Sequence, residues 1–144
     1  MGRSLAIWLA GFLILAGCAG REGAREVLLN TPAQHVSSGL KLLEAGKLDD
    51  AEREFNAALF LNDDYAGAYI GLSVVSARQG QVAKAWQSLG RAEALAKEEW
   101  ELGQIETARM EILMAEAKPG WLGEVEKAYL KSTSLSTQSS RATY

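Results

Sequence analysis

The sequence has few of the residues that most often carry chemistry. Its 144 residues include one cysteine, Cys18, one histidine, His35, and two prolines, Pro32 and Pro119. A single cysteine excludes an internal disulfide, and no second ligand is spaced to complete a metal site with the histidine. No P-loop, dinucleotide-binding or G-x-S-x-G motif occurs. We therefore expect no catalytic residues, no metal site, no cofactor and no enzymatic activity.

A strong charge of either sign is also missing. The 15 basic and 18 acidic residues give a net charge of −3, and no dense run of Lys or Arg appears. The global charge gives no reason to expect binding to nucleic acid. The composition, 48% hydrophobic and 23% charged, is ordinary for a globular protein, and the length fits one domain.

The longest apolar run is too short to span a membrane. It covers residues 5–16, LAIWLAGFLILA, and follows Arg3, whereas a spanning helix needs about 20 apolar residues. A positive start, an apolar centre and small residues before a cleavage point make up a signal peptide. We therefore expect residues 1–17 to be a signal peptide and not a permanent transmembrane anchor.

The end of this run resembles a bacterial lipobox, Leu15-Ala16-Gly17-Cys18. The resemblance implies that Cys18 receives a diacylglycerol thioether and becomes the first residue of a membrane-anchored chain, since two or three acyl chains anchor stably. The alternative is that Cys18 is a small buried hydrophobic residue. Ala19 stands where an aspartate would signal retention in the inner membrane, which favours the outer membrane, facing the periplasm. Residues 18–31 are then the lipidated cysteine and a tether, of which residues 27–29 either stay in the tether or dock on the folded part.

Residues 32–65 and 66–99 align with each other at an offset of 34 residues. The identical pairs are Gly46/Gly80, Ala51/Ala85, Ala58/Ala92 and Leu61/Leu95. Each copy predicts two helices, because apolar residues at helical spacing stand on both sides of a glycine, which is a helix-stop residue. Small residues at Gly39/Ser73 and at Ala51/Ala85 are expected where the two helices of a pair approach most closely.

The two copies resemble the tetratricopeptide repeat (TPR), a helix–turn–helix unit of 34 residues. Tyr69-x-x-Leu72-Ser73 matches the start of the family pattern, and Ala51-x-x-x-Phe55-x-x-Ala58 matches its second half. His35 stands where the family usually has Trp or Tyr, Ser38 replaces Leu, and both copies lack the closing proline. The resemblance implies an all-α fold, a short TPR-type α-solenoid of about three helix–turn–helix pairs.

Residues 100–131 predict a degenerate third pair, so that the TPR domain covers residues 32–131. Lys118-Pro119-Gly120 separate a long helix from an amphipathic closing helix, and terminal repeats are commonly atypical because they cap the stack. The apolar residues of the closing helix are Trp121, Leu122, Val125, Ala128, Tyr129 and Leu130. Residues 132–144 include eight serines and threonines, and we expect a disordered tail there.

The TPR resemblance also implies a concave groove lined by the first helix of each pair. The family positions that face such a groove are Val36, Leu40, Leu43, Glu44, Ile70, Val74, Ala77 and Arg78. The set is mostly apolar, which suits an amphipathic helix or an extended apolar segment of another envelope protein. The polar residues of a two-carboxylate clamp are missing at Val36, Leu40 and Gly71. The alternative is that these residues pack against the N-terminal segment or the third helix pair of the same chain.

An anchor combined with repeats predicts a protein–protein interaction adaptor in the bacterial cell envelope, held to the membrane by lipid on Cys18. The chain resembles small TPR lipoproteins that assist the assembly of a pilus or a secretion channel, such as pilotin-like proteins for secretins and the tight-adherence pilus lipoproteins. The alternative is a structural envelope organiser that oligomerises or tethers cell-wall enzymes, which leaves a homo-oligomer open.

Overall fold

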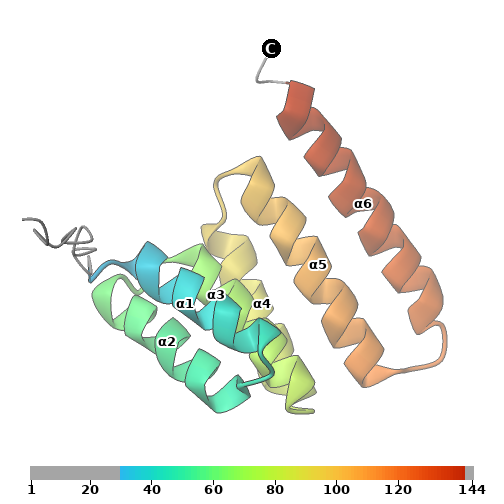
Figure 1. Ribbon diagram of the computed structural model, residues 1–144. Coiled ribbons are helices and arrows are strands. Elements are labelled where there is room, and N and C mark those ends of the chain that lie inside the picture. Colours follow the sequence, from blue (N-terminus) through green and yellow to red (C-terminus); the bar gives the residue numbers. More distant parts are fainter. Residues whose placement is uncertain (1–29, 142–144) are drawn as a thin grey trace, which may run out of the picture.

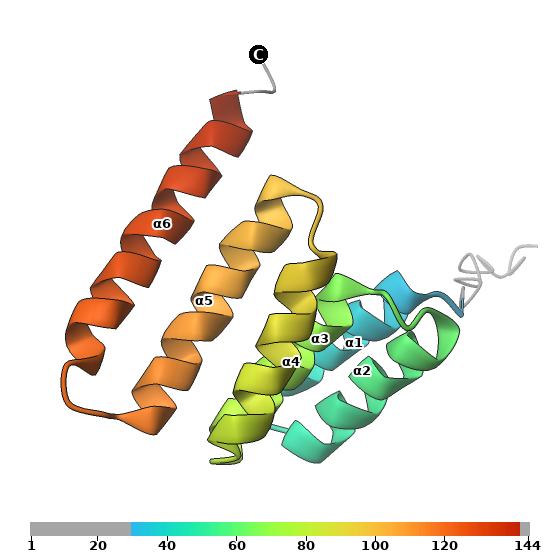
Figure 2. The ribbon, with the colours of Figure 1, turned by 180° about the vertical axis from the view of Figure 1, so that it is seen from behind.

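The computed structural model describes residues 30–141 and is all-helical over that range. Its helices are α1 (Pro32–Glu44), α2 (Leu48–Leu61), α3 (Ala66–Arg78), α4 (Val82–Leu95), α5 (Glu99–Glu116) and α6 (Trp121–Arg141) (Figures 1 and 2). The all-α class predicted from the sequence is confirmed for the described residues. The predicted signal peptide, Cys18 and most of the predicted tether lie outside them.

Local sequence sets both ends of α1. The Thr31 hydroxyl accepts a hydrogen bond of 3.2 Å from the Gln34 N–H, and Pro32 follows the cap at the first helical position. At the other end Gly46 has a φ of 73°, and the Lys47 N–H reaches a carbonyl of the last turn at 2.9 Å. The helix ends just before the glycine, as the sequence predicts, because a left-handed residue turns the chain out of the helix.

The first two helix pairs repeat one another. Each end of α1 lies 34 residues before the matching end of α3, and the same offset separates α2 from α4. The turn repeats too, since Gly80 has a φ of 75° and the Gln81 N–H bonds to the Ser76 carbonyl at 2.8 Å. The buried positions of α2 are Ala51, Phe55 and Ala58, and those of α4 are Ala85, Leu89 and Ala92. The 34-residue offset seen in the sequence therefore also relates the helix bounds, the turns and the buried positions of the two pairs.

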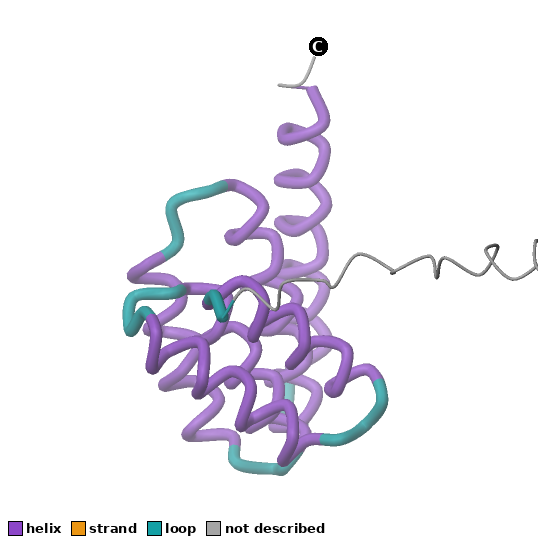
Figure 3. Tube along the Cα trace, turned by 60° about the vertical axis from the view of Figure 1, so that its left-hand side comes forward, coloured by secondary structure: helices purple, strands orange, loops and turns teal. Residues whose placement is uncertain are grey.

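The six helices form three pairs that lie side by side. α1 packs on α2, α3 on α4 and α5 on α6, while α3 also contacts α1, α2 and α5. Figure 3 shows these helices joined by short loops. α3 is therefore covered on every side, and each of its residues from Ala66 to Ala77 except Tyr69 is buried. Its sequence suits this position, because no charged residue occurs in the helix before Arg78.

The ring of Phe55 fills the space between α1, α2 and α3. It is fully buried and lies against Gly39 of α1 and Gly71 of α3. A Cβ atom added to Gly39 would lie 2.7 Å from the ring, and one added to Gly71 would lie 2.3 Å from it. The close approach expected at Gly39 is present, and a second one, at Gly71, comes from the packing of the next pair.

The third pair departs from the pattern of the first two. α5 has 18 residues where α1 and α3 have 13, and it ends at Ala117, a residue with a φ of 46°. α6 contacts only α5 among the described helices, and its far end projects beyond α5 in Figures 1 and 2. α6 therefore stands at one end of the stack.

The structure differs from the sequence prediction at the end of the chain. We expected a disordered tail over residues 132–144, whereas α6 continues to Arg141, so that the prediction is wrong for residues 132–141. Hydroxyl groups in this part donate to carbonyls one turn earlier, as in the 2.9 Å bond from Ser132 to Tyr129. Such bonds satisfy serine and threonine inside a helix, and composition alone does not reveal them.

Candidate partner-binding surfaces

Half of the predicted groove residues belong to the hydrophobic core. They are Leu43, Ile70, Val74 and Ala77, each with at most 8% of its surface exposed. Both α1 and α5 contact α3, so the face of α3 that the sequence assigns to a groove is covered. These four residues are therefore covered by other helices of the described range, which for α3 include α5 of the third pair.

Three of the predicted groove residues outside the core lie on α1. Leu40 is 39% exposed, Glu44 is exposed, and Val36 is partly buried against the core. We call these three residues the α1 edge. Among the described helices α1 contacts only α2 and α3, and neither covers this edge.

Arg78, the last predicted groove residue, is engaged within the protein. Its guanidinium donates two hydrogen bonds, of 2.9 and 3.0 Å, to the Glu111 carboxylate of α5 and a third, of 3.2 Å, to the Leu43 carbonyl of α1. The hydrogen bond to Glu111 raises the pKa of Arg78 above its ordinary value. Arg78 therefore joins α1, α3 and α5 at their C-terminal ends.

His35 makes two polar contacts at the start of α1. One ring nitrogen lies 2.8 Å from the Glu54 carboxylate of α2, and the other lies 2.8 Å from the side-chain oxygen of Asn30. Over residues 30–141 no group of three or more His, Cys, Asp or Glu is arranged to hold a metal ion. The contacts of His35 connect the first turn of α1 to α2.

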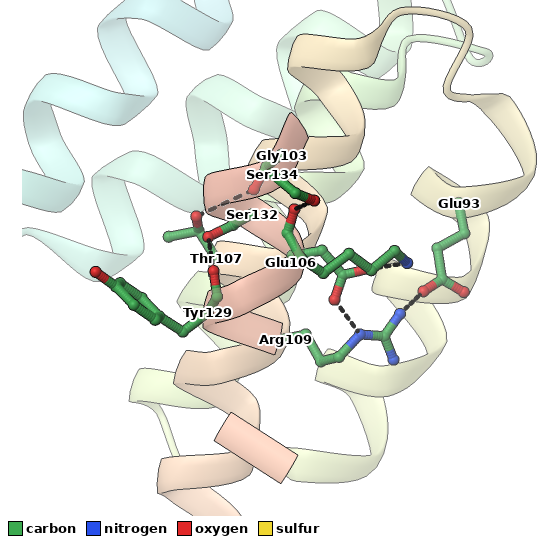
Figure 4. A network of polar contacts seen from close by, with 9 residues as sticks. Glu93, Gly103, Glu106, Thr107, Arg109, Tyr129, Ser132 and Ser134 are labelled. Atoms are coloured by element: carbon green, nitrogen blue, oxygen red, sulfur yellow. Dashed lines mark hydrogen bonds and ion pairs between the residues drawn. The ribbon is translucent and has the colours of Figure 1, made fainter. Parts of the chain in front are cut away.

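A buried carboxylate connects α5 to α6, and the sequence analysis did not single it out. Glu106 of α5 is 3% exposed and accepts hydrogen bonds from Arg109, at 3.1 Å, and from Lys131 of α6. Figure 4 shows that Arg109 also pairs with Glu93 of α4. The Arg109 guanidinium lies 5.8 Å from the ring centroid of Trp86. Three helices share this network. Its only signal in the sequence is an acidic residue directly beside the apolar positions of a predicted helix.

No described helix covers the side of α6 that faces away from α5. The side facing α5 carries the buried or partly buried Trp121, Val125, Ala128, Ser132 and Leu135. The opposite side carries Gly123, Glu126, Lys127 and Leu130, all exposed, which we call the α6 outer surface. Leu130 is 59% exposed, and Leu122 and Tyr129, beside this surface, are 66% and 57% exposed. The apolar face predicted for the closing helix is thus only partly covered.

The charges of the α6 outer surface are of both signs. Lys127 donates a hydrogen bond of 2.8 Å to Glu124, one turn earlier, and this bond raises the pKa of Lys127. Glu126 makes no ion pair with any residue in the range 30–141. The surface therefore offers one free carboxylate, one ammonium group and one large apolar side chain.

None of the helices in the described range combines the length and the apolar character that a membrane span requires. Comparison with known proteins adds no relative: no protein-family model matches the chain, and neither the curated proteins nor the solved structures contain a match.

Proposed function

We propose that this protein is a lipid-anchored TPR-type adaptor of the bacterial cell envelope, which holds another envelope protein at the membrane. The observation that carries the proposal is the 34-residue offset, which recurs in the bounds of the helices, in their turns and in their buried positions. A repeated helix pair of this length is the TPR unit. The lipobox resemblance at Cys18 supplies the anchor.

The surface proposed for the partner is the α1 edge, the exposed part of the predicted groove. Leu40 offers an apolar contact and Glu44 a charged one beside it, which suits an amphipathic helix. α3, which packs against α1, carries the buried groove residues Ile70, Val74 and Ala77. An envelope assembly machine such as a pilus or a secretion channel is the class of partner that the resemblance implies, and we expect no catalytic activity.

The anchor is tested by mass spectrometry of the protein purified from bacterial membranes. We expect a chain that begins at Cys18 and carries diacylglycerol, and a Cys18→Ala variant that stays an uncleaved precursor. A native product with an unmodified Met1 would refute the anchor.

The partner is tested by crosslinking and capture from membranes solubilised in mild detergent. Leu40→Glu should abolish capture of a specific protein while retaining helicity. Phe60→Glu is the matched control, because Phe60 is 91% exposed on α2, outside the predicted groove. Equal capture by both variants, or recovery of the protein alone, would refute binding at the α1 edge.

A structural organiser that oligomerises in the envelope is the second candidate function. The observation that favours it is the uncovered α6 outer surface with its exposed Leu130.

A further inference from the structure

We propose that α6 exchanges between two copies of this chain, so that α6 of each copy packs on α5 of the other in a domain-swapped dimer. The turn at residues 117–120 is the hinge. The contacts between α5 and α6 stay the same in such a dimer, and only the chain that supplies α6 changes. The inference concerns only the described helices, so it does not depend on the lipid anchor or on the partner of the α1 edge.

The position of α6 allows it to leave its own α5 without disturbing the other helices. It lies at one end of the stack (Figures 1 and 2) and contacts only α5 among the described helices. The face of α5 beneath it nevertheless needs a cover, because Glu106 is 3% exposed and pairs with Lys131 of α6. Ala128 of α6 is likewise 3% exposed. The α6 of a second copy carries the same side chains and therefore fits this face as well as the chain's own α6.

The turn that holds α6 against α5 contains a strained residue. Ala117 ends α5 with a φ of 46°, and within residues 30–141 it is the only residue other than glycine with a positive φ. The turns after α1 and α3 have glycine at the left-handed position, Gly46 and Gly80. Alanine is unfavourable there because its Cβ lies too close to the following carbonyl oxygen. Opening the turn releases this strain, and short connections under strain favour swapping.

The sequence of the turn also favours an open and extended hinge. Pro119 fixes its own φ and disfavours the helical conformation at Lys118, so α5 and α6 do not merge into one helix when the turn opens. A backbone hydrogen bond of 3.0 Å, from the Trp121 N–H to the Lys118 carbonyl, closes the turn. Extended chain from Glu116 to Trp121 spans up to about 17 Å, whereas packed helix axes lie about 8–10 Å apart. The hinge is therefore long enough for α6 to reach α5 of a second copy.

The hinge is tested by changing its strain in the full chain. Each protein is unfolded in urea and refolded over a concentration series, because α6 must detach before it can exchange. Sedimentation velocity in a density-matched detergent, which removes the contribution of the micelle, then measures the dimer. We expect a wild-type dimer that increases with concentration, and Ala117→Gly should weaken it about tenfold, because glycine removes the strain from the monomer. Ala45→Gly is the matched control, because Ala45 ends α1 with a φ of −76° and glycine releases no strain there.

Two charge reversals test whether the second chain supplies α6. Glu106→Lys places two lysines together at the contact between α5 and α6, and Lys131→Glu places two glutamates together. Each variant alone keeps this repulsion, whether α6 comes from its own chain or from a second copy. In a swapped heterodimer of the two variants, every lysine faces a glutamate. An equimolar mixture should therefore refold to a 1:1 dimer, identified by native mass spectrometry, with an association constant at least about tenfold above that of either variant alone.

Several outcomes would overturn the proposal. One is a wild-type chain that stays monomeric at every refolding concentration, and another is a dimer that Ala117→Gly leaves unchanged. A third is a mixture in which both charge variants fold but stay separate, because the contact between copies would then not be the one between α5 and α6. If a charge variant does not fold, the response to Ala117→Gly compared with Ala45→Gly decides by itself.

Discussion

At the scale of single residues, one aromatic ring restricts one position on each of two helices to glycine. The Phe55 ring leaves no room for a Cβ atom on either Gly39 or Gly71. These glycines are needed for space, whereas Gly46 and Gly80 are needed for their positive φ. The contact at Gly71 joins the first helix pair to the second, so it bears on the stacking of the pairs and not only on one pair.

We expect Gly71→Ala to destabilise the protein by about 1–3 kcal/mol, measured by urea unfolding, because the new methyl group overpacks a filled space. Gly90→Ala is the control. A Cβ on Gly90 meets nothing within 4 Å, so alanine should stabilise that helix by about 0.5–1 kcal/mol. Phe55→Leu added to Gly71→Ala should recover part of the loss. A neutral Gly71→Ala would show that the ring has other space to occupy.

An ion pair between α2 and α4 makes stability depend on pH. Lys84 donates a hydrogen bond of 2.7 Å to Glu52, and this bond lowers the pKa of Glu52 below 4.5 despite the opposing effect of burial. A carboxyl group whose pKa is lower in the folded state adds stability above its unfolded pKa. That stability is lost as the pH falls through the folded pKa.

We therefore expect Lys84→Gln to lower the free energy of unfolding at pH 7 by about 0.2–1 kcal/mol, the usual range for partly exposed pairs. At an acidic pH below the folded pKa of Glu52, where the carboxyl is protonated in both states, the variant and the wild type should be equally stable. Urea unfolding at both pH values measures the difference. Lys41→Gln, at another exposed lysine, should show no such pH dependence, and an equal loss at both pH values would exclude the pair as the cause.

At the scale of helices, the docking of α6 depends on a charge buried in α5. Glu106 is 3% exposed, so removing Lys131 would leave its carboxylate with Arg109 as its sole cation. We expect Lys131→Met to destabilise the protein by about 1–3 kcal/mol. Lys127→Met removes an exposed pair on the same helix, screened by solvent, and should change stability far less.

A double-mutant cycle separates the charge from the rest of the lysine side chain. When Glu106→Gln is already present, no buried charge is left unpaired, so Lys131→Met should then cost much less. Thermal unfolding of the four chains measures the coupling. Equal costs of Lys131→Met in both backgrounds would mean that the lysine stabilises the protein through its alkyl chain.

The sequence predicted those elements that depend on local signals. The ends of α1 and α3 follow from the glycines at 46 and 80, because a residue with positive φ turns the chain out of a helix. The full length of α6 was not predicted, because a helix whose serine and threonine hydroxyls bond to its own carbonyls has the same composition as a disordered tail.

The candidate surfaces were predicted less well, because they depend on which helices cover which. The TPR resemblance implied that Ile70, Val74 and Ala77 line a groove on the first helix of a pair. In a stack of three pairs, however, α3 has a neighbour on each side, so these residues are buried. The network around Glu106 was not predicted from the sequence for a related reason, because Glu93 and Lys131 reach it from other helices.

At the scale of the whole molecule, the central pair is stabilised from both sides. α3 contacts α1 and α2 on one side and α5 on the other, and Arg78 connects the C-terminal ends of all three first helices. The α1 edge and the α6 outer surface lie at opposite ends of this stack. A partner on α1 would therefore leave the α6 outer surface free, so the two candidate functions proposed above are compatible in one assembly.

This architecture predicts that two pairs alone do not form a stable protein. A chain that ends at Lys97 lacks α5, and with it the buried side chains Ile105, Ala108 and Ile112 that cover α3 and α4. Each large apolar side chain contributes about 1.5–3 kcal/mol on burial, and a small domain has only about 5–15 kcal/mol of net stability. We expect the shortened chain to lose cooperative thermal unfolding, followed by circular dichroism at 222 nm.

A chain that ends at Gln138 is the matched control, because it keeps α5 and nearly all of α6 and should unfold cooperatively within a few degrees of the full chain. The comparison decides how stability is distributed along the stack. If stability resided in each pair separately, the chain ending at Lys97 would unfold cooperatively near the temperature of the full chain. Because α3 depends on contacts from both neighbouring pairs, we expect the chain ending at Lys97 to melt broadly. It should also expose the apolar faces that α5 covers in the intact protein.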